Sequence, residues 1–143
     1  MFESCPSEYR NGCTEKTQVM VIAGQSAVFD ASVMYTPGGS CDFQQTIERV
    51  MLWRINRDFR VPDSLIFSCS TAEGAQCYAN DTRVSLSRGD KPGLQFRFTL
   101  SSTQLSDNSS YRVIVIRRHP GTGAEMNLMK NFDLRVDPGE LAS

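Results

Sequence analysis

The chain has 143 residues, 15 basic and 16 acidic side chains, a formal net charge of −1 and a hydrophobic fraction of 40%. This length suits one domain with its own core, and the balanced charge argues against a nucleic-acid or membrane-surface binder, which normally carries a basic excess. Its apolar runs are far shorter than the roughly 20 residues of a membrane span, so we expect any membrane anchor or leader to lie outside this sequence.

Short runs of alternating apolar residues follow one another along the chain, separated by clusters of Gly, Pro, Asn and Asp. In chain order the apolar positions are Ala27, Phe29, Ala31 and Val33; Met51, Trp53 and Ile55; Phe96, Phe98 and Leu100; Tyr111, Val113 and Val115; and Phe132, Leu134 and Val136. Such alternation places one side of each strand on a core and the other side in solvent. Many short strands without a long helical pattern predict an all-β sandwich or barrel.

The cysteines and two sequons indicate an oxidising, extracellular setting. Five cysteines occur without a CxxC pair, and His119 is the single histidine, so a zinc site has little support and disulfides explain the cysteines better. The tripeptides that begin at Asn80 and Asn108 are N-glycosylation acceptors, and we expect both to be surface sites. His119 lacks a nucleophile and an orienting carboxylate in the sequence around it, so we expect a solvated loop histidine, no enzyme activity and no cofactor.

The segment from Leu105 to Val113 resembles the entry to strand F of an immunoglobulin domain. Asp107 precedes Tyr111 by four residues, as in that family, and the upstream strands line up with the same pattern. The resemblance implies that Tyr111 packs inward, that Trp53 is the core tryptophan of strand C, and that Arg83 pairs with Asp107. It therefore implies a variable-type, two-sheet Greek-key sandwich.

The resemblance also divides the chain. Residues 17–137 match the variable-type domain, residues 1–16 form an N-terminal segment with two cysteines, and residues 138–143 form a linker or tail. The family's central disulfide would join positions 31 and 113, but this chain has Ala31 and Val113 there, so we expect them to pack in the core. Other cysteines should compensate. The expected pairs are Cys69–Cys77 and Cys13–Cys41, with Cys5–Cys41 as the alternative and one cysteine left over.

The outward positions of the expected sheet predict a contact surface. If Trp53 and Tyr111 point inward, an aliphatic patch ringed by charges lies on the outer side, which is typical of protein-binding surfaces. The predicted binding face consists of Leu52, Arg54, Arg112, Ile114, Ile116, Arg118 and Asp133. The alternative is that neighbouring loops, or residues 57–68, fold over this patch.

The missing central disulfide and the long cysteine-bearing segment before strand C are similar to the N-terminal domain of the allorecognition receptors of colonial hydroids, which are cnidarians. That resemblance implies the extracellular part of a single-pass plasma-membrane protein that binds the same protein on an opposing cell, with weak homo-oligomers in solution. It implies no nucleic acid and no small-molecule substrate. The alternatives are a heterophilic immune receptor, a secreted or viral decoy domain, and a structural spacer.

Overall fold

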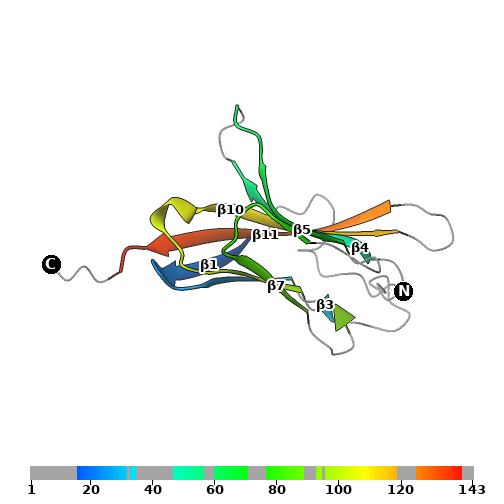
Figure 1. Ribbon diagram of the computed structural model, residues 1–143, viewed down its shortest axis with the longest axis horizontal. Helices are drawn as coiled ribbons and strands as arrows, with labels where there is room; N and C mark the ends of the chain where they lie inside the picture. Colours follow the sequence, from blue (N-terminus) through cyan, green and yellow to red (C-terminus); the bar gives the residue numbers. More distant parts are fainter. Residues whose placement is uncertain are drawn as a thin grey trace.

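A computed structural model describes residues 16–31, 33–34, 47–56, 60–70, 77–88, 93–94, 96–118 and 125–139. Within these ranges the chain forms β-strands and one short 3-10 helix, η2 (Leu105–Asp107). Figure 1 shows the strands in two layers, with β10, β11, β4 and β5 in one layer and β7 and β3 in the other. This arrangement confirms the expected all-β sandwich of two main sheets.

The larger sheet has six strands in the order β1-β11-β10-β4-β5-β6. β1 runs parallel to β11, and every other neighbouring pair in this sheet is antiparallel. Its strands are β1 (Lys16–Ile22), β4 (Ile47–Ile55), β5 (Ser64–Ser70), β6 (Cys77–Ala79), β10 (Ser109–Arg118) and β11 (Glu125–Asp137). In this order β1, the first described strand, forms one edge of the sheet, and β6 forms the other.

The second sheet has three antiparallel strands in the order β2-β9-β7, where β2 is Ala27–Asp30, β9 is Phe96–Leu100 and β7 is Val84–Arg88. A separate small sheet pairs two residues of β3 (Val33–Met34) with two residues of β8 (Gly93–Leu94). The buried residues of β2 and β9 alternate with exposed or partly exposed ones, as the period-two pattern predicts.

The core is built around aromatic side chains that come from both sheets. The Phe29 ring of β2 lies 4.9 Å from the Tyr111 ring of β10 and 5.3 Å from the Phe132 ring of β11, measured between centroids. All three side chains are buried, and such tilted and edge-on contacts are favourable arrangements of aromatic rings. Ala31 and Val113 are also buried, each at 1% exposure, so small apolar groups fill the centre of the sandwich.

The prediction that Trp53 belongs to the core is wrong. Leu52 is fully buried at 0% exposure, whereas Trp53 is only partly buried. On β4, Leu52 lies opposite Val113 of β10, and Trp53 lies opposite Arg112 on the other side of the sheet. Because side chains alternate along a strand, an offset of one residue exchanges all inward and outward positions.

Candidate functional site

The candidate site is the outer face of the six-stranded sheet, meaning the side turned away from the core. The strand register places its residues in rows that run across the strands. Met51 of β4 lies opposite Ile114 of β10, which lies opposite Met129 of β11. The next rows add Trp53 on one side and Ile116 on the other. All five side chains are partly exposed, so they form an apolar cluster that the fold leaves accessible to solvent.

Two residues of the predicted binding face, Leu52 and Arg54, lie on the inner side instead. Leu52 is part of the core, as described above. The Arg54 guanidinium lies 6.0 Å from the centre of the Tyr111 ring, and its Nη2 donates to the backbone oxygen of Ser106 at 2.7 Å. The prediction for these two residues is wrong for the same reason as that for Trp53, which is the one-residue offset on β4.

Four of the predicted residues do lie on the outer face: Arg112, Ile114, Ile116 and Asp133. They occupy successive outward positions on β10 and β11, with Arg112 opposite Asn131 and Asp133 opposite Ser110. The side chain of Arg118 lies outside the described residues. Met51, Trp53 and Met129 are members that the sequence analysis missed. The residues of β4 are apolar on both sides, so alternation alone gave no signal for which side faces out.

Polar side chains border the apolar cluster and hold one another in place. Arg49 Nη1 donates to Ser68 Oγ at 2.7 Å, and Arg112 Nε donates to Asn131 Oδ1 at 2.7 Å. At the edge of the sheet, Tyr78 of β6 is 58% exposed and lies in the row of Met51. An apolar centre with an arginine-containing polar border is the usual anatomy of a protein-binding surface.

The indole of Trp53 adds an unusual feature to this face. In the described part of the chain, its Nε1–H is shielded from solvent and has no hydrogen-bond acceptor. A buried donor without a partner costs about 1–3 kcal/mol, and native proteins contain few of them. The Trp53 indole therefore packs on the outer face without a hydrogen bond to its Nε1–H among the described residues.

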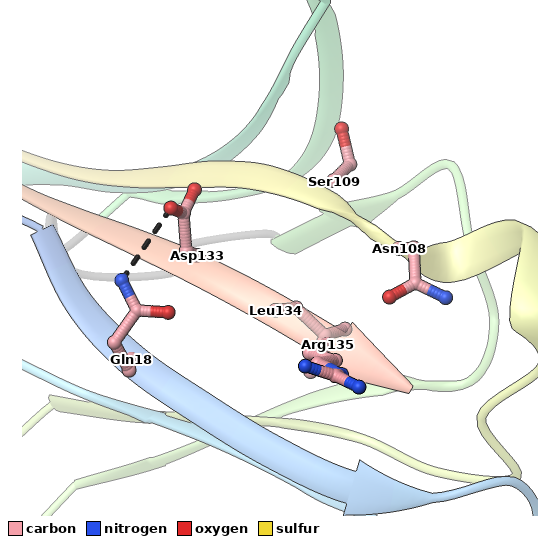
Figure 2. A pocket seen from close by; sticks show the side chains of 6 residues that line it. All are labelled: Gln18, Asn108, Ser109, Asp133, Leu134 and Arg135. Carbon is pink, nitrogen blue, oxygen red and sulfur yellow. Dashed lines mark hydrogen bonds between the residues drawn. The ribbon is translucent and has the colours of Figure 1, made fainter. Parts of the chain in front are cut away.

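A polar hollow lies beside the cluster, over β1, β11 and the start of β10 (Figure 2). Asp133 organises it: its carboxylate accepts from Ser110 Oγ at 2.6 Å and from Gln18 Nε2 at 3.4 Å, and lies 3.6 Å from Lys16 Nζ. The residues that line the hollow are Gln18, Asn108, Ser109, Asp133, Leu134 and Arg135. The described residues contain no group of three or more His, Cys, Asp or Glu side chains placed to hold a metal ion.

The expected ion pair between Arg83 and Asp107 is present, away from the outer face. Arg83 Nη1 and Nη2 donate to the two oxygens of Asp107 at 2.8 and 2.9 Å, and its Nε and Nη2 donate to Asp81 at 3.0 and 2.7 Å. Hydrogen bonds from Arg83 lower the pKa of both carboxyl groups, and the two carboxylates raise the pKa of the guanidinium. Asp81 is a second partner of Arg83 that the resemblance did not predict.

Tyr111 closes the same corner. Its hydroxyl donates to the backbone oxygen of Asp107 at 2.7 Å, and burial raises the pKa of Tyr111 to about 12. Asp107 also accepts from the backbone N–H of Gln104 at 2.7 Å, which caps η2. This corner is a structural element, because the polar groups of Asp81, Arg83, Asp107 and Tyr111 bond to one another and to the backbone.

Of the expected disulfides, Cys69–Cys77 is present and joins directly opposed residues of β5 and β6. The proposed pairs that involve Cys5, Cys13 and Cys41 lie outside the described residues. Both sequon asparagines, Asn80 and Asn108, are exposed. No helix in the described ranges is long and apolar enough to cross a membrane.

Comparison with known proteins identifies the fold. No family model and no curated protein matches the chain. Among solved structures, murine CRIg is similar over 83% of this chain and 91% of that chain, with a TM-score of 0.61 and 16% sequence identity. The fold is immunoglobulin-like. A chain from a structure of T cell specificity and activation by the bacterial superantigen toxic shock syndrome toxin-1 covers 85% of this chain and 94% of its own length, with a TM-score of 0.56 and 14% identity.

The strand order gives the immunoglobulin-like fold its variable-type form. In the letters of that fold, β4, β5 and β6 are strands C, C′ and C″, β10 and β11 are F and G, and β2, β9 and β7 are B, E and D. Strands C′ and C″ extend the sheet that carries C, F and G, which is the mark of the variable type. The candidate site is therefore the outer face of the sheet that contains strands C, F and G.

Proposed function

We propose that this chain is an extracellular recognition domain that binds protein through the outer face of its six-stranded sheet. The observation that carries the proposal is the apolar cluster of Met51, Trp53, Ile114, Ile116 and Met129, which the fold leaves partly exposed. Monomeric proteins rarely expose contiguous apolar area without a use for it. The immunoglobulin-like fold is compatible with this role, and the proposal assigns no catalytic step or cofactor.

The partner we propose is a second copy of the chain on an opposing cell, in self/non-self discrimination, with the domain carried by a single-pass plasma-membrane protein. Self-association through one face has two-fold symmetry, so the face must complement itself. Arg49 and Asp133 lie opposite Ile116 and Ser110 of β10, which are six residues apart. The cation and the anion are thus separated by roughly 20 Å along the strands, with the apolar cluster between them. Antiparallel apposition of two copies brings unlike charges together.

The alternative is a heterophilic role, as an immune receptor or as a secreted or viral decoy, through the same face. A heterophilic domain would remain monomeric by itself, which separates the two proposals. A structural spacer has less support, because a spacer has no need of an exposed apolar cluster.

Sedimentation of the purified domain over a wide concentration range tests the homophilic proposal. We expect concentration-dependent dimers that Ile114→Asp abolishes, because the new carboxylate would be buried among apolar side chains. Val28→Asp is the matched control: Val28 is 39% exposed and lies on β2 of the other sheet. Weak affinity is amplified on beads coated with the domain, which should aggregate through many simultaneous contacts. Monomers in solution together with dispersed beads would refute homophilic binding, and equal losses in both variants would refute the assigned face.

A further inference from the structure

The side-chain amide of Asn108, between η2 and β10, makes three hydrogen bonds to backbone groups. Its Nδ2 donates to the backbone oxygens of Leu105 at 2.8 Å and Val136 at 3.0 Å, and its Oδ1 accepts from the backbone N–H of Val136 at 2.8 Å. Val136 thus exchanges both of its backbone groups with the amide, as it would with a residue of a neighbouring strand. Figure 2 shows this side chain beside the end of β11. Asn108 therefore extends the β10–β11 ladder with a side chain and clamps the C-terminal end of β11.

We infer that Asn80 carries an N-linked glycan in the folded protein, and that Asn108, although it begins a sequon, does not. The inference rests on the extracellular location proposed above, because glycan transfer takes place in the secretory pathway. It concerns the two asparagines only and does not depend on which partner the outer face binds.

The chemistry of transfer sets the geometric requirement. Asparagine Nδ2 attacks C1 of an oligosaccharide carried on a lipid diphosphate, so that the Nδ2–C1 bond forms, the bond from C1 to the diphosphate oxygen breaks, and Nδ2 loses one proton to a base of the transferase. The product is a secondary amide, which strongly prefers the trans form. In that form C1 takes the place of the hydrogen on the same side as Oδ1.

At Asn108 this position is already occupied. Because Oδ1 accepts from Val136 N–H, the hydrogen beside Oδ1 is the one that points to the Val136 oxygen, 3.0 Å from Nδ2. A carbon bonded at about 1.45 Å from the nitrogen would lie deep inside contact distance of that oxygen. The sequon serine is also engaged: Ser110 is 4% exposed, and its hydroxyl donates to Asp133 at 2.6 Å. A glycan on Asn108 and the clamp on β11 exclude each other.

The amide of Asn80 is bonded less fully than that of Asn108. Asn80 is exposed, as is Thr82, the third residue of its sequon. Its Oδ1 accepts from the Tyr78 hydroxyl at 2.7 Å, and in the described residues Nδ2 donates to a single acceptor, the Leu65 oxygen at 2.8 Å. At Asn80 one of the two Nδ2 hydrogens thus has no acceptor among the described residues, whereas both Nδ2 hydrogens of Asn108 are bonded.

The two asparagines lie at opposite ends of the six-stranded sheet's strand order, near β6 and near β11. Asn80 directly follows β6, the edge strand of the six-stranded sheet, and a glycan there would shield this edge from pairing with other strands. Asn108 lines the polar hollow next to Asp133, so its unmodified state leaves that end of the outer face uncovered. Sugar would thus cover one edge of the sheet and leave strands β10 and β11 open to a partner.

The inference is tested by secreting the chain from a eukaryotic cell line and releasing its glycans enzymatically in oxygen-18 water. Mass spectrometry of tryptic peptides then identifies the released sites. Released sites gain a mass tag, and trypsin separates them, because Arg83 follows Asn80 whereas Arg97 and Arg112 flank Asn108. We expect the tag on Asn80 and none on Asn108. A tag on Asn108 in folded protein, or an untagged Asn80, would overturn the inference.

Two matched substitutions test the clamp. Asn80→Gln should remove the glycan mass and lower the Tm of bacterially produced, glycan-free protein less than Asn108→Gln does, because the Asn80 amide makes two hydrogen bonds and the Asn108 amide makes three. Asn108→Gln should leave the glycan mass unchanged and lower that Tm by several degrees, because the longer side chain misplaces the amide. An Asn108→Gln variant with the parent's Tm would refute the clamp. The Ile114→Asp sedimentation test measures self-association through the outer face and can be made on glycan-free protein. The binding proposal and the glycosylation proposal can therefore fail separately.

Discussion

Replacement of Arg83 by Met should destabilise the domain strongly, because it leaves a buried carboxylate without its cation. The Asp107 side chain is 5% exposed and would keep only its bond from the Gln104 N–H. Removal of one partner from a buried ion pair costs about 3–5 kcal/mol. Arg83 is itself 27% exposed, so water can enter and the loss should fall near the lower end, at about 3 kcal/mol. For a domain of this size that corresponds to a fall in Tm of roughly 10 °C.

The assay is urea unfolding followed by the fluorescence of Trp53, the single tryptophan. Urea is preferable to guanidinium chloride because it does not screen charges. Arg97→Met is the matched control, since Arg97 pairs with Asp30 at 3.2 Å but both side chains are largely exposed, at 58% and 44%. Exposed pairs contribute about 0–1 kcal/mol, so this variant should lose less than about 1 kcal/mol. Equal losses in the two variants would refute the assigned role of the buried pair.

The same variant should change the response to acid. Arg83 lowers the pKa of Asp81 and Asp107 in the folded state, so their contribution to stability is present above the unfolded pKa, near about 4, and is lost as the pH falls through the folded values. Without Arg83 much of that contribution is already absent at neutral pH. The difference in unfolding free energy between parent and Arg83→Met should therefore shrink below about pH 4. A difference that stays constant down to pH 2, or grows, would contradict this linkage.

Three further predictions address the disulfide, the register of β4 and the corner tyrosine. Replacement of both Cys69 and Cys77 by Ser should cost about 2.5 kcal/mol in urea unfolding, because their separation of 8 residues closes a short loop; no loss would mean that the bridge does not constrain the unfolded chain. Leu52→Ala should cost about 3 kcal/mol and Met51→Ala clearly less, and the reverse order would show that the assigned register is wrong. Tyr111→Phe should cost about 1–2 kcal/mol by leaving a buried carbonyl unpaired, and the phenolate absorbance that it removes should titrate near pH 12. Because Tyr111 keeps its proton longer in the folded state, stability should decline as the pH rises from about 10 to 12, and a parent and variant with the same alkaline profile would contradict this.

Much of the sandwich was predictable from local sequence patterns. Strand β9 has Phe and Leu on one side and Arg and Thr on the other, so its alternation identified the buried side correctly. Strand β10 is apolar on both sides in its centre, and there the resemblance that places Tyr111 inward identified the buried side. The Arg83–Asp107 pair and the inward Tyr111 followed from the resemblance of residues 105–113 to the entry of strand F in an immunoglobulin domain. The Cys69–Cys77 bridge followed from proximity in the sequence, since eight residues suffice for a hairpin between two strands.

The outer face was only partly predictable, because β4 has apolar residues on both sides. The run from Val50 to Trp53 contains Val, Met, Leu and Trp in succession, so a period of two fits either set equally well. The choice is made by the opposite strand: Val113 and Val115 require Leu52 and Val50 as inward neighbours, and Trp53 is left outside. That pairing joins residues about sixty positions apart and has no local signal.

The sequence by itself determined that the chain forms short strands around an aromatic core, because apolar residues at every second position, between Gly, Pro, Asn and Asp clusters, are a local property of each segment. Only the tertiary structure decided which apolar residues reach the outer face and that Asn108 bonds to Val136. Each of these depends on the register between segments distant in sequence, and a shift of one residue in that register reverses which side chains meet.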